Sequence, residues 1–311
     1  MRPVRACLLI PAGAAGTLLA LGLAAGCGAP PSQQQAPRGG KHDATVLQFW
    51  RVFNEATALR MKGAFADAAR TYEEALALDP RHEDSLYYLG QCLQELGQPV
   101  GARKAFTRLV DLNPSSARGH LALGALLASP LESLPLDLDA AEAHLRRAHE
   151  INGEETGPML RLGEVLIVKG DAVEARHWIA AAAATNPRSV ESAFLNGYVL
   201  WEAGDQAGAR ACYTRAINAS RPEAPVKGVL NEGDRKADPA KSPGRIAAPP
   251  LKSPMGKTLF GSFSAMAVEA AAGQEDPAVR PIDLNAVYGP VRVQADRLAR
   301  RASPATASRR S

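Results

Sequence analysis

The sequence predicts an all-α fold of about five stacked helical hairpins, and three periodic features lead to this prediction. The first is a small residue that recurs every 34 residues, apart from one interval of 39: Ala56, Gly90, Gly124, Gly163 and Gly197. The second is an alanine twelve places after four of these positions: Ala68, Ala102, Ala175 and Ala209. The third is a proline that closes three units: Pro80, Pro114 and Pro187. A period of this length indicates repeats that bury their apolar faces by stacking on one another.

Within a unit, the pattern predicts two antiparallel helices. In the second unit, Leu86, Leu89, Gly90 and Leu93 fall at i, i+3, i+4 and i+7, which is one face of a helix. The partner helix shows the same spacing in Ala102, Phe106 and Leu109. Glycines mark the turns between the two helices: Gly63, Gly97, Gly170 and Gly204. The closing prolines end the second helix, because proline lacks the amide hydrogen and clashes with the preceding turn.

This pattern resembles the tetratricopeptide repeat (TPR) family, in which Leu, Gly and large residues mark the first helix and Ala, an aromatic residue, Ala and Pro mark the second. The second unit departs from the family at Leu109, where Ala is usual. The resemblance implies a right-handed TPR solenoid whose first helices line a concave surface. It covers five repeats: 47–80, 81–114, 115–153, 154–187 and 188–222.

The third repeat is five residues longer than the others, and residues 129–139 hold the extra length. Pro130 and Pro135 keep this stretch out of a helix, so the sequence predicts a loop before a second helix that runs from Ala140 to about Ile151. Two interpretations stay open for the loop. It is either a tolerated surface elaboration or a lip that contacts a partner beside the groove.

The amino terminus has the layout of a secretory signal peptide, predicted for residues 1–26. Arg2 and Arg5 precede an uncharged apolar run. The run ends in Cys27 and resembles the lipobox of bacterial lipoproteins, although Ala24 stands where leucine is preferred. The resemblance implies lipidation of Cys27 and a bacterial cell-envelope location facing the periplasm or exterior; the alternative is an uncleaved membrane helix. Residues 27–46 are predicted to be a flexible, lipidated linker.

The carboxyl-terminal tail, 223–311, is predicted to be largely disordered. It contains 10 prolines and 14 Lys and Arg against 9 Asp and Glu, whereas residues 27–222 contain 20 against 23. Neither balance is extreme enough to indicate nucleic-acid binding. Two stretches are less clearly disordered, 259–268 and 295–302. The first is interpreted either as a short helix that caps the solenoid or docks on a partner, or as a local apolar cluster.

The sequence contains no recognisable catalytic, metal or cofactor motif, so the protein is predicted not to be an enzyme. Gly256-Lys257-Thr258 is similar to the end of a phosphate-binding loop, but Leu251 stands where that loop needs glycine. The six histidines show no ligand spacing. Cys92 and Cys212 lie three repeats apart, too far for a disulfide, and are predicted to be buried apolar residues.

Function is therefore expected in the groove of the first helices. Inward-facing positions recur there at spacings of 3, 4 and 3, and many are aromatic, as binding hot spots are. The predicted contacts are Trp50, Phe53, Tyr87, Gln91, Gln94, Arg118, Leu160, Glu164, Phe194, Tyr198 and Trp201. The alternative is that these side chains pack between repeats or against the tail folding back. Capture of a terminal carboxylate, known in some TPR proteins, is not expected, because Phe53 and Thr57 occupy the matching places.

Together these features predict a non-catalytic, membrane-anchored scaffold that binds a peptide or protein partner in the cell envelope. The alternative is an accessory or regulatory subunit of an envelope enzyme or secretion complex. The sequence does not identify the partner or the oligomeric state.

Overall fold

The computed structural model of the protein describes residues 40–220, 254–261, 263 and 282–302. All regular secondary structure in these residues is helical. The helices are α1 (Gly40–Met61), α2 (Phe65–Leu78), α3 (Glu83–Glu95), α4 (Pro99–Leu112), α5 (Ala117–Leu127), α6 (Leu138–Ile151), α7 (Thr156–Lys169), α8 (Ala172–Thr185), α9 (Val190–Glu202), α10 (Gln206–Ser220) and α12 (Leu284–Ala302). The predicted signal peptide, Cys27 and most of the predicted linker lie outside the described residues.

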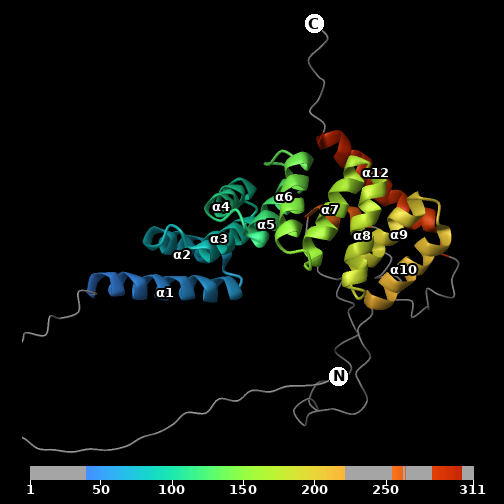
Figure 1. Ribbon diagram of the computed structural model, residues 1–311. Helices are drawn as coiled ribbons and strands as arrows, with labels where there is room; N and C mark the ends of the chain where they lie inside the picture. Colours follow the sequence, from blue (N-terminus) through green and yellow to red (C-terminus); the bar gives the residue numbers. More distant parts are fainter. Residues whose placement is uncertain (1–39, 221–253, 262, 264–281, 303–311) are drawn as a thin grey trace, which may run out of the picture. The chain divides into compact units, whose positions relative to one another are not determined.

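The helices α3 to α10 form hairpins that stack in sequence order, which confirms the predicted all-α fold. The second helix of each repeat also contacts the first helix of the next, as in the pairs α4 and α5 or α8 and α9. In the first repeat, α1 contacts α2, and the ring centroids of Phe53 on α1 and Tyr72 on α2 lie 5.9 Å apart. Helix order and hairpin pairing can be followed in Figure 1.

Glycine in the first helix lets the two helices of a repeat approach closely. A Cβ atom at Gly90 would lie 2.3 Å from the Phe106 ring, and one at Gly163 would lie 2.3 Å from Ile179. The predicted turn glycines have a different role, because they adopt the left-handed backbone conformation, with φ of 67° at Gly97. The periodic glycines of the sequence thus divide into packing and turn positions.

The long loop of the third repeat, between α5 and α6, is packed against the helices. Leu134 is 2% exposed and belongs to the same apolar core as the helices around it. Ser129 is also buried and donates a hydrogen bond to the Ala125 carbonyl, at 2.7 Å. The loop is therefore part of the core, and α6 begins at Leu138, two residues before the predicted start.

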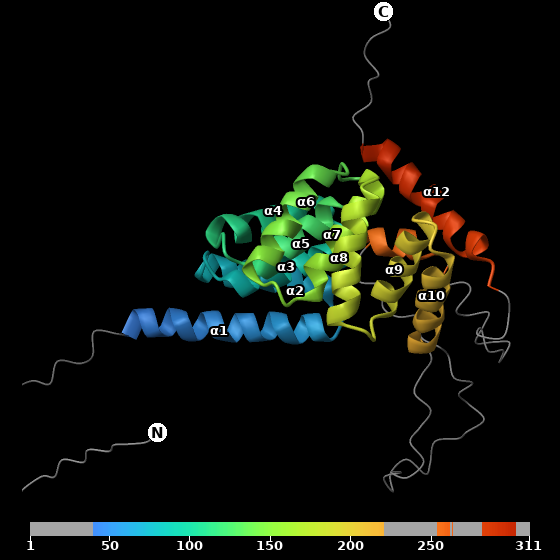
Figure 2. The same cartoon turned by 45° about the vertical axis from the view of Figure 1, so that its right-hand side comes forward.

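Two parts of the tail that was predicted to be largely disordered are ordered helices. Residues 254–261 are helical, and α12 contacts α7, α9 and α10. Figures 1 and 2 both show α12, in red, beside α9. Both helices overlap the stretches that the sequence set apart as less clearly disordered, 259–268 and 295–302. Helix α12 begins earlier, at Leu284, because an apolar stripe at helical spacing packs on the repeats: Leu284, Val287, Tyr288, Val291, Ala295 and Leu298.

Candidate functional site: the face of the first helices

The predicted groove residues separate into an accessible group and a covered group. The accessible group lies on α1, α3 and α5, where every member is at least partly exposed: Trp50, Phe53, Tyr87, Gln91, Gln94 and Arg118. The second group lies on α7 and α9, where all members except the half-buried Trp201 are buried: Leu160, Glu164, Phe194 and Tyr198. The structure therefore places the eleven residues in two different environments.

An aromatic cluster lies at the amino-terminal end of this face. Trp50 on α1 is 48% exposed and packs edge-on against Phe53 and His82, at centroid distances of 5.8 and 5.7 Å. Phe49 completes the cluster and is buried, with its ring 4.6 Å from His82. The cluster holds the Trp50 ring in place while leaving half of it open to solvent. Such a rigid, partly exposed indole is suited to contact a partner.

Tyr87 on α3 is held from two sides. The Arg118 guanidinium lies over its ring, 5.0 Å from the centroid, and also pairs with Asp84. Gln91 donates a hydrogen bond to the Tyr87 hydroxyl, at 3.0 Å. Burial raises the pKa of Tyr87, so its hydroxyl stays neutral at physiological pH. The face from α1 to α5 therefore contains both aromatic and polar groups. These groups can contact the apolar side chains of a peptide and bind its backbone amides.

At the other end, the chain's own tail covers the predicted groove. The Phe194 ring is fully buried and lies 4.5 Å from Phe260 and 5.3 Å from Tyr288. Tyr198 is 5% exposed, with its ring 6.1 Å from that of Tyr288. Phe194 and Tyr198 therefore contact the tail, in keeping with the interpretation in which the tail folds back.

Polar contacts fix α12 along α9. The Trp201 indole nitrogen donates to Asn285, at 3.1 Å, and the guanidinium of Arg292 lies 4.8 Å from the Trp201 ring centroid. Arg292 also donates to Glu202, at 2.6 Å. These contacts are exposed to solvent, where an ion pair contributes up to about 1 kcal/mol. Apolar burial around Tyr288 consequently dominates the attachment of α12.

A buried charged triad lies beneath the tail. Arg161 on α7 donates to Glu164 on the same helix, at 2.5 Å, and to Glu191 on α9, at 2.7 Å. Burial lowers the pKa of Arg161, but the two carboxylates outweigh this effect and raise it, so the guanidinium stays charged. Glu164 is one of the predicted contacts, but the sequence pattern did not indicate that Arg161 pairs it with Glu191 of the next repeat.

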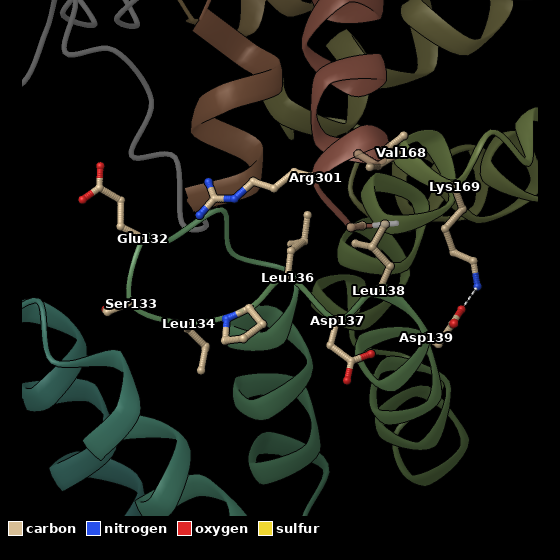
Figure 3. A pocket seen from close by; sticks show the side chains of 13 residues that line it. Glu132, Ser133, Leu134, Leu136, Asp137, Leu138, Asp139, Val168, Lys169 and Arg301 are labelled. Atoms are coloured by element: carbon tan, nitrogen blue, oxygen red, sulfur yellow. Dashed lines mark hydrogen bonds and ion pairs between the residues drawn. The ribbon is translucent and has the colours of Figure 1, made fainter. Parts of the chain in front are cut away.

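The loop of the third repeat borders a cavity of about 1040 Å³ at the end of α12. Figure 3 shows Arg301 of α12 reaching the loop, where it donates to the Pro130 carbonyl at 3.1 Å and also to the Leu131 carbonyl. Lys169 on the far side of the cavity pairs with Asp139 and with Glu142. The loop therefore contacts the tail of the same chain, a partner that the sequence pattern did not indicate.

The cysteines, the possible metal ligands and the length of apolar helices in the described residues can be compared with the predictions. Cys92 and Cys212 are buried free thiols, and burial raises the pKa of each. In the part of the chain that the structure describes, no group of three or more His, Cys, Asp or Glu side chains is placed to hold a metal ion. Within the same part, no helix is both long and apolar enough to cross a membrane.

Comparison with known families supports tetratricopeptide repeats in two stretches of the chain. Residues 59–126 and residues 160–225 each match a family model described as tetratricopeptide repeat. The first match begins in the first helix of the first repeat and ends in the first helix of the third, and the second begins in the first helix of the fourth repeat and ends three residues beyond the fifth.

Two relatives share part of the sequence. Cellulose synthase 2 operon protein C of Komagataeibacter xylinus is 30% identical over 169 residues, which is 54% of this chain and 12% of that protein. The tetratricopeptide repeat and J domain-containing co-chaperone DNJ1 of Cryptococcus neoformans is 25% identical over 114 residues, which is 37% of this chain and 22% of that protein. This chain therefore spans a minor part of the length of both relatives.

Solved structures share the fold. The structure of PilF from Pseudomonas aeruginosa aligns with a TM-score of 0.52 at 15% identity, covering 74% of this chain and 91% of that one. MamA from Desulfovibrio magneticus RS-1 aligns with a TM-score of 0.50 at 17% identity, covering 56% of this chain and 95% of that one. At these identities the likeness concerns the fold alone.

Proposed function

We propose that this protein is a non-catalytic scaffold that binds a protein or peptide partner on the accessible face of α1, α3 and α5. The observation that carries the proposal is the half-exposed Trp50, which its neighbours hold in place beside Phe53. TPR arrays generally mediate protein–protein interaction, and two stretches of this chain match that repeat. The buried Phe194 and Tyr198 are excluded from the proposed contact surface while the tail covers them.

The test is partner capture by cross-linking in intact cells, followed by mass spectrometry. A Trp50→Ala, Tyr87→Ala double variant should lose the protein that the wild-type chain captures, while its helical circular dichroism is unchanged. Val173→Ala is the matched control, because Val173 is 84% exposed on the second helix of the fourth repeat, away from the proposed surface. Equal capture by the double variant and the wild type would overturn the proposed surface.

We further propose that Cys27 is lipidated and anchors the scaffold in the bacterial cell envelope. The support is the apolar, uncharged run that ends at this cysteine, after Arg2 and Arg5. More than one acyl chain gives stable membrane attachment, whereas a single chain gives reversible attachment. Replacing Cys27 with Ser should abolish acyl labelling and move the protein to the soluble fraction. Continued labelling of the variant would refute the anchor.

A second candidate is an accessory subunit of an envelope enzyme or secretion complex. The observation that favours it is the 30% identity to a protein named for a cellulose synthase operon, although the match covers 12% of that protein. The cross-linking experiment separates the two candidates. Capture of one enzyme in fixed proportion would favour the accessory subunit, and capture of assembly or secretion proteins would favour the scaffold.

A further inference from the structure

Residues 254–261 and 263 lie on the face of α7 and α9 as a bound amphipathic helix. Their large apolar side chains are at most 1% exposed and fall at i, i+4, i+5 and i+8: Met255, Leu259, Phe260 and Phe263. The opposite side, with Lys257 and Gly261, is exposed. The rings of Phe260 and Phe263 both pack on Phe194 of α9, at 4.5 and 5.0 Å. This is how a helical peptide binds in an apolar groove, with anchors at helical spacing.

A single glycine crosses the charged triad beneath this helix. A Cβ atom at Gly256 would lie 2.6 Å from Glu191 Oε1, 2.7 Å from Glu164 Oε1 and 3.0 Å from Arg161 Nη1. The three charged side chains hold one another by hydrogen bonds and are nearly inaccessible, so they have little freedom to move aside. A residue larger than glycine at position 256 therefore cannot occupy the groove without separating these ion pairs.

The closed arrangement, in which this helix and α12 are both packed on the repeats, also buries polar atoms at a cost. Glu191 Oε1 and the Tyr288 hydroxyl are buried, and neither has a hydrogen-bond partner among the described residues. A buried polar group without a partner costs about 1–3 kcal/mol, a penalty that disappears when water reaches it. A cleft of about 150 Å³ that is open to solvent also separates part of α12 from the helices α7 and α9. The tail is thus held by apolar contacts against these opposing penalties.

We propose that residues 254–261 and 263 are a releasable internal ligand, and that the groove on α7 and α9 binds a partner helix of the same pattern once they leave. The partner helix would carry large apolar residues at i, i+4, i+5 and i+8 and a glycine at i+1, where it passes Arg161, Glu164 and Glu191. This inference goes beyond the scaffold surface proposed on α1, α3 and α5, and does not depend on it. The tail then acts as an intramolecular competitor of the partner.

The test uses the full-length chain and a fluorescent synthetic peptide of residues 250–266. The wild-type protein should bind the peptide weakly, because its own segment occupies the groove. Gly256→Val should displace that segment and bind the peptide at least about tenfold more tightly. Gly261→Val is the matched control: it lies in the same helical segment, a Cβ there meets nothing within 4 Å, and its peptide affinity should equal that of the wild type.

A second variant shifts the equilibrium in the opposite direction. Tyr288→Phe removes the buried hydroxyl without a partner and should favour the closed state, weakening peptide binding about fivefold or more relative to wild type. The proposal is overturned if Gly256→Val binds no more peptide than Gly261→Val, or if both Gly256→Val and Tyr288→Phe change affinity in the same direction. Loss of the helical fold in Gly256→Val alone would also overturn it, because the segment would then be a fixed part of the core. None of these three outcomes bears on partner capture through Trp50.

Discussion

Gly90 and Phe106 illustrate how single residues set the helix spacing within a repeat. The Phe106 ring is fully buried, and a Cβ at position 90 would lie 2.3 Å from it. Gly90→Ala therefore forces the two helices apart, and overpacking of this kind costs about 1–3 kcal/mol. We expect the free energy of unfolding in urea, followed by circular dichroism, to fall by this amount.

Gly153→Ala is the control for this prediction. Gly153 lies in the turn after α6, does not adopt a positive φ, and its added Cβ would meet nothing closer than 3.7 Å. The free energy of unfolding of Gly153→Ala should stay within about 0.5 kcal/mol of that of the wild type. Equal losses in the two variants would show that the destabilisation arises from replacing glycine in general and not from the contact with Phe106.

A histidine pair between α5 and α6 links stability to pH. His120 Nε2 lies 3.2 Å from the Pro114 carbonyl, to which it donates, so its Nδ1 accepts from His144 Nδ1 at 2.9 Å. Burial lowers the pKa of both rings; Arg147 lowers that of His120 further, whereas Asp137 partly opposes the shift at His144. Protonation of either ring is therefore disfavoured in the folded state.

The sign of the pH effect follows from these lowered pKa values. The unfolded chain binds more protons than the folded chain below an ordinary histidine pKa of about 6.5, so stability is complete above that pH and falls as the pH drops below it. We expect the urea midpoint to decrease between pH 7.5 and pH 5. His144→Phe should reduce this decrease, whereas His177→Gln, at an exposed position on α8, should not. A pH dependence unchanged in His144→Phe would contradict the assignment.

At the scale of helices, the sequence predicted the repeats because each is specified by residues close together in the chain. Glycine and alanine at fixed spacing, turn glycines and closing prolines all act within one hairpin. Of the tail helix α12, only residues 295–302 were set apart from the disordered tail, because its partners Phe194 and Tyr198 lie far away in sequence. Its apolar stripe from Leu284 to Leu298 was a usable signal, but Pro290 interrupts it and the tail is rich in proline.

The candidate site also combines features that local spacing predicts with features that depend on distant contacts. Spacing alone selected Trp50, Tyr87 and Phe194 as residues of one face, but it could not show which of them the tail covers. That outcome depends on contacts across 66 residues or more, such as those of Phe194 with Phe260. The triad was likewise hidden, since Arg161 and Glu191 belong to different repeats.

The loop of the third repeat provides a prediction about one element. Arg301 donates to the carbonyls of Pro130 and Leu131, so Arg301→Ala should release the loop from α12. We expect faster amide hydrogen exchange in residues 129–137 and a loss of about 0.5–1.5 kcal/mol in stability, the usual net contribution of a hydrogen bond.

Arg300→Ala is the matched control, because Arg300 is exposed on the same helix and makes no hydrogen bond or ion pair with the described residues. It removes the same charge without touching the loop. If both variants speed exchange equally, the effect comes from net charge, and the contact of Arg301 with the loop does not hold it in place.

For the repeat array as a whole, stability is the sum of contributions from each repeat and from its contacts with its neighbours. The tail contacts α7, α9 and α10, which belong to the fourth and fifth repeats. Within α7, every residue from Pro158 to Val168 is buried, whereas a helix on the surface of the array would expose one face. The tail is therefore expected to stabilise one end of the array selectively.

Deletion of residues 223–311 tests this expectation by hydrogen exchange and mass spectrometry. Removing the tail exposes apolar side chains of α7 and α9, including Phe194, at about 25 cal/mol for each Å². Amides of these two helices should exchange at least about tenfold faster, while those of α3 and α4 stay as in the full chain, because α12 packs on α7, α9 and α10. A uniform increase across all repeats would mean that the array unfolds as one cooperative unit, and unchanged exchange in α7 would mean that the tail adds no stability there. Only a change confined to the last two repeats and to the loop of the third repeat, which Arg301 contacts, agrees with a tail that covers part of the binding face and leaves the aromatic cluster around Trp50 accessible.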